Sequence, residues 1–145
     1  IGFRYVSMDE LLSNSDIVTL HVPYNDHTHH LLNNESIKKM KKGAIIINTS
    51  RGAVIDTDAL ASALEKNHLG GAGLDVIEGE ELINEEKELL YRKGDYDKWK
   101  PIIERNEKLF HMENVVFTPH NAFNSKEALI RIIDTTIENI LEYKK

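Results

Sequence analysis

Four short apolar runs of the sequence each end in polar or ionisable residues. In chain order, the residues after the runs are His21-Val22-Pro23, Asn48-Thr49-Ser50-Arg51-Gly52, Asp75 with Glu78 and Glu80, and Thr118-Pro119-His120-Asn121. The set contains an arginine, several carboxylates and a histidine, which are the residue types of an acid–base site. One such end would be unremarkable, but four at the same edge of a fold suggest a functional site.

Each of these residues also has a structural interpretation that the sequence leaves open. Arg51 could pair with a surface acid, and Asp75 could cap the turn that follows it. Glu78 and Glu80 could belong to a solvated acidic loop that continues into Glu81. His120 could be a packing histidine with satisfied hydrogen bonds.

Three further histidines, His27, His29 and His30, stand close together. No carboxylate at metal-ligand spacing lies beside them, and the chain has no cysteine. Zinc sites are built from such combinations of ligands. We therefore expect no metal, and we interpret these histidines as loop and helix-start residues.

The pattern of apolar residues predicts how these segments are positioned. Strands are expected at 3–6, 17–20, 44–47, 72–74 and 115–117, and helices at 7–12, 34–40, 56–67 and 125–143, with a helical insert at 82–112. Strands that are apolar on both faces and alternate with helices are typical of a parallel sheet covered on both sides. Such doubly wound α/β folds bind ligands at the carboxyl ends of their strands.

Composition narrows the class of protein. The chain has 145 residues, the size of one domain, and a net charge of −6, which argues against nucleic acid as the main partner. No apolar run is long enough to span a membrane. The first residue is Ile1, so a targeting signal cannot be judged. The absence of cysteine is compatible with the cytoplasmic location that we expect.

Four segments then resemble one enzyme family, the D-isomer-specific 2-hydroxyacid dehydrogenases. The resemblance rests on Leu11-Leu12-Ser13-Asn14-Ser15-Asp16-Ile17-Val18-Thr19-Leu20-His21-Val22-Pro23, on the run from Met40 to Asp56, on Gly73-Leu74-Asp75-Val76-Ile77-Glu78-Gly79-Glu80, and on Thr118-Pro119-His120-Asn121-Ala122-Phe123. It covers essentially the whole chain. It implies an oxidoreductase that uses NADH to reduce pyruvate or a related 2-oxo acid to a D-2-hydroxy acid.

The resemblance also implies catalytic roles. Arg51 resembles the residue that anchors the substrate carboxylate, which suits its planar fork of donors. His120 resembles the general acid–base, and Glu80 its partner, since a carboxylate beside an imidazole favours the charged ring. Glu80 is chosen over Glu78 because the family's catalytic acid lies five residues after the aspartate, here Asp75.

The expected cofactor is NAD. Residues that match cofactor-lining positions of the family are His21, Val22, Pro23, Thr28, Thr49, Ser50, Arg51 and Asp75. The choice between NAD and NADP cannot be read from the chain, because the discriminating residue of the family lies upstream of Ile1.

The chain departs from the family in three ways. Glu81 follows the catalytic glutamate where many relatives have proline, and the insert at 82–112 resembles the D-lactate dehydrogenase branch. The phosphate-binding motif G-x-G-x-x-G is absent, since no helix opens after Gly70-Gly71-Ala72-Gly73. We therefore expect a partial Rossmann-type sheet that lacks its first βαβ unit.

Two domains are expected from the resemblance. Residues 1–121 would be the C-terminal portion of the NAD-binding domain, and residues 122–145 a helix that returns to the substrate domain. A sheet without its first strands would leave an open edge, so we expect a homodimer, and we expect the isolated chain to be inactive. The alternative is a cofactor-binding scaffold without turnover, as in the C-terminal-binding-protein corepressors of the same family.

Overall fold

The computed structural model describes residues 2–80 and 96–143, and for residues 96–99 it describes the backbone alone. Glu81 and residues 82–95 of the predicted insert lie outside these ranges.

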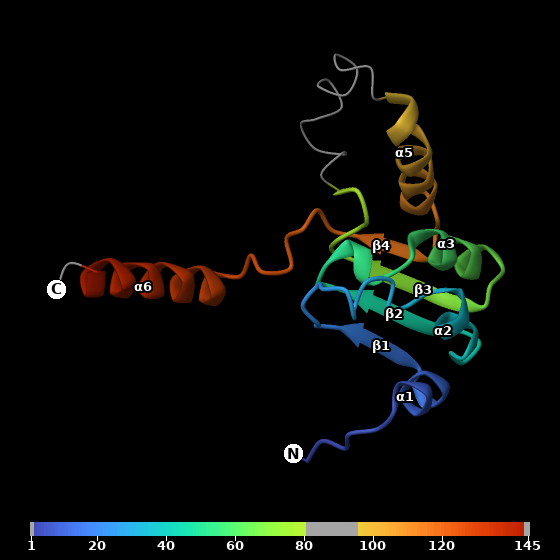
Figure 1. Ribbon diagram of the computed structural model, residues 1–145, viewed down its shortest axis with the longest axis horizontal. Coiled ribbons are helices and arrows are strands. Elements are labelled where there is room, and N and C mark those ends of the chain that lie inside the picture. The colour runs from blue at the N-terminus through green and yellow to red at the C-terminus, as the bar shows by residue number, and fades with distance from the viewer. Residues whose placement is uncertain (1, 81–95, 144–145) are drawn as a thin grey trace.

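Four parallel strands form the centre of the molecule (Figure 1). They are β1 (Ile17–Leu20), β2 (Ala44–Asn48), β3 (Leu69–Leu74) and β4 (Val115–Phe117), and they lie side by side in the order β1-β2-β3-β4. All three pairings are parallel, so each strand starts at the same edge of the sheet as its neighbour. This arrangement confirms the predicted α/β fold, and β3 begins three residues earlier than the sequence indicates.

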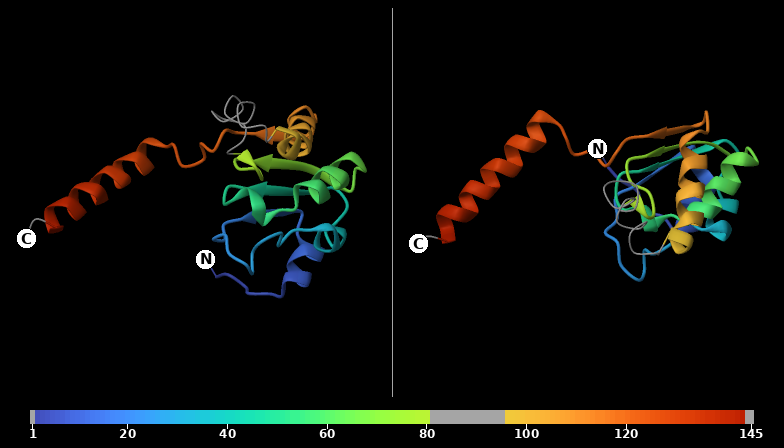
Figure 2. Two further views of the ribbon diagram at one scale, coloured as in Figure 1. Left: turned by 45° about the horizontal axis from the view of Figure 1, so that its top comes forward. Right: turned by 90° about the horizontal axis from the view of Figure 1, so that it is seen from above.

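Helices α2 (Asn34–Lys38), α3 (Thr57–Glu65) and α5 (Tyr96–Phe110) connect successive strands. They lie on the same face of the sheet (Figure 2). Between that face and the helices lies the core, in which Ile46, Leu60, Leu64 and Leu109 are at most 2% exposed. Burial of these side chains supplies the main stabilisation of the fold.

The opposite face of the sheet is accessible in the described part of the chain. Ile17 and Ile45 are register partners on that face and are 57% and 39% exposed, and Val116 is 69% exposed. The sequence predicts that helices cover both faces of the sheet, but in the described part of the chain they cover only one face.

The first residues differ from the prediction. Helix α1 (Met8–Asn14) begins as predicted, because the Ser7 hydroxyl accepts a hydrogen bond from the backbone N–H of Glu10. The predicted strand at 3–6 is wrong, since this segment is irregular and Phe3 and Tyr5 are 88% and 98% exposed. Among residues 2–80 and 96–143 no strand pairs with this segment, and a single strand cannot satisfy its backbone groups.

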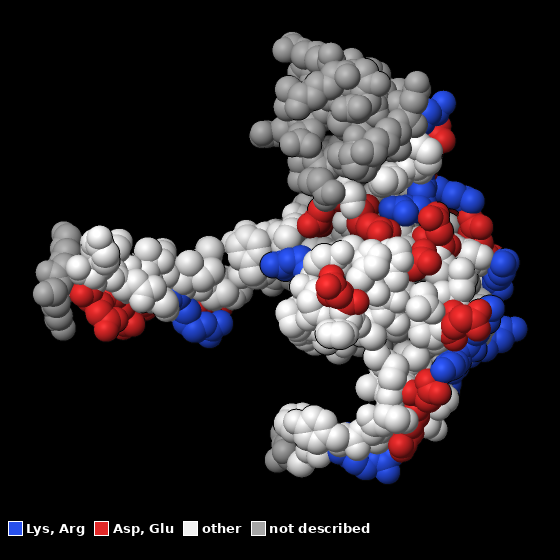
Figure 3. All heavy atoms as spheres, in the orientation of Figure 1, with Lys and Arg blue, Asp and Glu red and all other residues white. Residues whose placement is uncertain are grey.

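The last helix, α6 (Lys126–Tyr143), projects away from the sheet (Figure 1). None of its residues is buried, and Ile133, Ile137 and Leu141 are 50–58% exposed. Within the described residues, no helix is long and apolar enough to cross a membrane. On the face shown in Figure 3, acidic and basic side chains are interspersed around the rim of the sheet domain.

Candidate active site

The four predicted segments all follow the carboxyl ends of the parallel strands, so the fold brings them to one edge. Residues 21–23 follow β1, residues 49–51 follow β2, residues 75–80 follow β3 and residues 118–121 follow β4. Because the strands are parallel and adjacent, this edge is the place where a ligand meets several loops at once.

His120 and Glu80 are in contact at this edge. Nδ1 of His120 lies 3.1 Å from Oε1 of Glu80. Glu80 is held in a tight turn, in which its backbone N–H donates to the carbonyl of Ile77 and its Oε2 accepts from the N–H of Ile77. Gly79 adopts a positive φ of 76° in this turn, a conformation that glycine allows at no steric cost.

The contact orients the imidazole ring. A carboxylate can accept a proton-bearing ring nitrogen as a partner, and Nδ1 is the nitrogen of His120 that faces Glu80. Nε2 forms no hydrogen bond with any described residue, and the side chain is 47% exposed. His120 can therefore exchange a proton through Nε2 with a molecule bound at the edge of the sheet.

Asp75 shapes the loop that carries His120. One carboxylate oxygen accepts from the Thr118 hydroxyl and from the N–H of Asn121, at 2.8 Å, and the other accepts from the N–H of Ala122 at 2.9 Å. The carbonyl of Asp75 also accepts from the N–H of His120, whose φ of 49° is left-handed. These bonds fix the loop directly after β4.

The electrostatics of Asp75 follow from these contacts. Its side chain is buried, and burial alone would raise its pKa. The hydrogen bonds from Thr118, Ala122 and Asn121, with the nearby charge of His120, outweigh burial and hold the pKa of Asp75 below its usual value. Asp75 is thus an ionised group that is already bound within the protein, and its predicted contact with a cofactor stays a prediction.

Asn48 organises the turn after β2, and the sequence analysis did not select it. Its Oδ1 accepts from the N–H and the hydroxyl of Ser50, at 3.0 and 2.8 Å, and its Nδ2 donates to the carbonyl of Arg51 at 3.0 Å. Asn48 is 1% exposed. An asparagine at a strand end that bonds the backbone two residues on is a known turn signal, which could have identified it.

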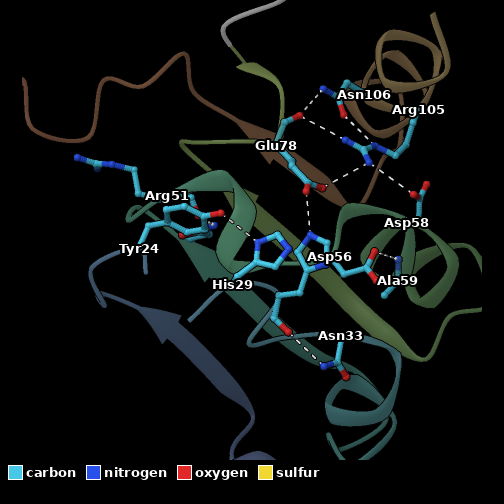
Figure 4. Close-up of polar contacts among 12 residues, drawn as sticks. Tyr24, His29, Asn33, Arg51, Asp56, Asp58, Ala59, Glu78, Arg105 and Asn106 are labelled. Atoms are coloured by element: carbon cyan, nitrogen blue, oxygen red, sulfur yellow. Dashed lines mark hydrogen bonds and ion pairs between the residues drawn. The ribbon is translucent and has the colours of Figure 1, made fainter. Parts of the chain in front are cut away.

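Arg51 extends from this turn into solvent. Its guanidinium donates to the carbonyl of Ser50 at 2.7 Å, and no carboxylate of a described residue forms an ion pair with it. In Figure 4 the side chain points away from the network around Glu78. The guanidinium therefore keeps donors available for an anionic ligand.

Gly52 begins a short 3-10 helix, η1 (Gly52–Val54), and packs directly on the loop that leads to Glu80. A Cβ at this position would lie 2.2 Å from the carbonyl carbon of Ile77 and 2.4 Å from the nitrogen of Glu78. The absence of a side chain thus lets the Arg51 segment and the Glu80 segment touch backbone to backbone.

An open pocket of about 700 Å³ lies beside Arg51. Its lining residues are His21, Val22, Pro23, Tyr24, Thr49, Ser50 and Arg51. Six of these seven are predicted cofactor-lining residues, and Tyr24 is an addition that the sequence analysis missed. The volume is in the range of small-molecule and cofactor sites, so the residues present fit part of a dinucleotide.

Thr28 acts on the shape of this pocket instead of lining it. Its hydroxyl donates to the carbonyl of Pro23 at 2.7 Å and accepts from the N–H of Asn25 at 2.8 Å. Its predicted contact with a cofactor stays a prediction. The structural role of this hydroxyl is to join residues 23 and 25 of the loop after β1, next to the residues that line the pocket.

Two of the three clustered histidines, His29 and His30, contact other side chains. His29 stacks on His30 with ring centroids 3.9 Å apart, and its Nδ1 lies 3.1 Å from the Tyr24 hydroxyl. His30 contacts Glu78. Among the described residues, no group of three His, Cys, Asp or Glu side chains is arranged to hold a metal ion.

Comparison with known proteins is decisive at this point. Residues 1–122 match the model of the D-isomer specific 2-hydroxyacid dehydrogenase family, NAD binding domain. The chain belongs to this family. The match confirms the resemblance read from the sequence and the expected cofactor class, because the matched model is that of an NAD-binding domain.

Individual relatives agree with this assignment. The chain is 47% identical over 146 aligned positions to the D-specific alpha-keto acid dehydrogenase of Enterococcus faecium, and the match covers 100% of this chain and 42% of that protein. A D-lactate dehydrogenase from Sporolactobacillus superimposes with a TM-score of 0.83 at 36% identity, over 98% of this chain and 40% of its own. The Aquifex aeolicus D-lactate dehydrogenase, solved with NAD and lactic acid, gives 0.78 at 39% identity, with 97% and 40% covered. The chain thus spans about two fifths of the length of these relatives.

Proposed function

We propose that this chain carries the acid–base and cofactor-binding residues of an NAD-dependent D-2-hydroxyacid dehydrogenase, which reduces pyruvate or a related 2-oxo acid to the D-2-hydroxy acid. The observation that supports this most is the 3.1 Å contact between His120 and Glu80 at the same sheet edge as the Arg51 pocket. The family membership and the names of the relatives agree with it.

In the proposed reaction, the guanidinium of Arg51 binds the substrate carboxylate and polarises the keto oxygen. A nicotinamide cofactor held by the pocket beside Arg51 would supply the hydride that the keto carbon accepts. Nε2 of protonated His120 gives its proton to the developing alkoxide, and Glu80 stabilises the charged ring through Nδ1 before the transfer. The products are the hydroxy acid, the oxidised cofactor and neutral His120, which takes up a proton from solvent, so charge and atoms balance.

Steady-state oxidation of NADH by the intact gene product tests this proposal, with pyruvate, 2-oxoisocaproate and phenylpyruvate as substrates. His120→Ala should lower turnover by about 10²-fold or more, because the proton donor is lost. His111→Ala is the matched control, since that exposed histidine directly after α5 contacts a backbone carbonyl through its ring and lies outside the predicted site. Equal turnover of the two variants would contradict the acid–base role of His120.

The scaffold alternative makes a different prediction from the same assay. A cofactor-binding scaffold would bind NADH but would oxidise it no faster when a 2-oxo acid is added. Turnover of none of the three acids, with NADH binding intact, would favour this alternative.

We further propose that residues 122–145 belong to a second, substrate-binding unit, that residues 1–145 alone are inactive, and that the intact protein is a homodimer. Support comes from the apolar surface that the described residues leave accessible on α6 and on one sheet face. Large exposed apolar surface on a globular protein marks a site of association. The relatives are also more than twice as long as this chain.

A further inference from the structure

Glu78 lies two residues before Glu80, but its side chain points to different partners. Its Oε1 lies 2.8 Å from Nε2 of His30, and its Oε2 lies 3.4 Å from a guanidinium nitrogen of Arg105. The carboxylate is 24% exposed, His30 is 32% exposed and Arg105 is 13% exposed. Glu78 therefore joins the loop after β1 to helix α5, across 48 residues of chain on one side and 27 on the other.

Helix α5 also holds the backbone of Glu78. The carbonyl of Glu78 accepts from Nδ2 of Asn106 at 3.0 Å and from the Arg105 guanidinium at 3.3 Å. Asn106 is 1% exposed, so this amide has little access to water. Figure 4 shows both side chains reaching from α5 toward Glu78, with Asp58 as a second carboxylate beside Arg105. The position of Glu78 is thus fixed from the helix side at two points.

His30 contacts Glu78 on one side and His29, which neighbours the pocket, on the other. Its φ of 47° is left-handed, its N–H donates to the carbonyl of Ala53, and its own carbonyl accepts from Nδ2 of Asn33. Its ring stacks on His29 with an angle of 21° between the planes, and His29 contacts the hydroxyl of Tyr24, which lines the pocket. In Figure 4 a dashed line marks the contact between Tyr24 and His29.

We propose that Glu78 is a positioning residue, which holds the wall of the cofactor pocket in place through His30, His29 and Tyr24 and anchors that wall to helix α5. Glu78 itself need not contact cofactor or substrate. These contacts hold the Tyr24 side chain in one orientation before the ligand binds. Binding then does not include the entropic cost of ordering that side chain. This inference rests on the proposed function, because it needs the pocket to hold the dinucleotide.

The test is the equilibrium affinity for NADH, measured by calorimetry on the intact gene product. Glu78→Ala and His30→Ala should each raise the Kd for NADH by about tenfold, the equivalent of one charge-assisted hydrogen bond. The double variant should lose no more than either single variant, because both break the same connection. Glu78→Gln, which can still hydrogen-bond His30, should recover part of the affinity.

Asp58→Ala is the matched control, since Asp58 is a 79%-exposed acid that also contacts Arg105 but has no link to His30. It should leave the Kd unchanged. A purely structural role for Glu78 would lower Tm in the variants without moving the Kd, and losses that add in the double variant would also contradict the proposal.

This readout separates the inference from the proposed function. If the protein binds NADH but reduces no 2-oxo acid, the dehydrogenase proposal fails while the Kd series still decides the role of Glu78. If the wild-type protein binds no NADH, both are overturned. If turnover is normal and the Glu78→Ala and Glu78→Gln variants both bind NADH like wild type, only the positioning role is overturned.

Discussion

Gly52 gives the sharpest prediction about the site, because its surroundings leave no room for a side chain. A Cβ there would lie 2.2 Å from the carbonyl carbon of Ile77, whereas ordinary contact begins at 3.4 Å. The neighbouring atoms are backbone and cannot rotate away. Gly52→Ala must therefore separate η1 from the 77–80 turn by about 1 Å, which moves Arg51 relative to Glu80 and His120.

The size of the effect follows from this displacement. A misplacement of about 1 Å between reacting groups can lower the rate about 10²-fold. Overpacking of this kind also costs about 1–3 kcal/mol of stability. We expect kcat for 2-oxo-acid reduction by the intact gene product to fall by about 10²-fold, with the variant still folded as judged by denaturant unfolding and circular dichroism.

Gly70→Ala is the matched control for this experiment. Its Cβ would lie 2.4 Å from the carbonyl oxygen of Gly43, so it meets a similar backbone clash. Gly70 lies near the start of β3, at the edge of the sheet opposite to the site. It should lose comparable stability and keep its turnover. A folded Gly52→Ala variant with wild-type kcat would refute the reasoning.

Two further predictions concern stability and assembly. The pKa of Asp75 is lowered in the folded protein, so its ionisation stabilises the fold at neutral pH, and this contribution is lost as the pH falls below the usual value of 3.8 toward the lowered one. Asp75→Asn leaves the N–H of Ala122 without its acceptor, so the variant should lose about 1–3 kcal/mol of unfolding free energy at neutral pH. In denaturant titrations at falling pH, the variant should lose less stability than the wild-type protein. A stability difference between the two proteins that does not change with pH would contradict the assigned ionisation. Sedimentation velocity of the intact gene product should show a dimer at micromolar concentration, and a well-folded monomer would exclude the proposed assembly.

The fold could be predicted from the sequence where the local residue pattern and the packing of neighbouring elements favour the same secondary structure. Strand β2 reads as Ala44 followed by three isoleucines, and the structure places it between two parallel neighbours. Ser7 and Asp56 both precede helices with a capping side chain, as such residues do. The segment 3–6 has the apolar pattern of a strand but pairs with no strand in the described part of the chain, and periodicity alone cannot reveal that.

The site could be predicted at the level of which loops meet, but not at the level of which atoms meet. Parallel strands bring His120 and Glu80 to one edge, and their contact follows from the Ile77–Glu80 turn. The pairing of Glu78 with His30 joins residues 48 positions apart and depends on the left-handed backbone of His30. Neither spacing nor composition carries that information, and this is also why the inward direction of the Asp75 carboxylate was not foreseen.

The stereochemistry of the product tests the central claim most directly. The intact gene product, NADH and pyruvate should yield lactate that is consumed by a D-specific and not by an L-specific lactate oxidoreductase, and the initial rate of its formation should fall about 10²-fold or more in His120→Ala. L-Lactate, a racemic product, or full D-lactate production by His120→Ala would contradict the account that the Arg51, Glu80 and His120 edge performs this reaction.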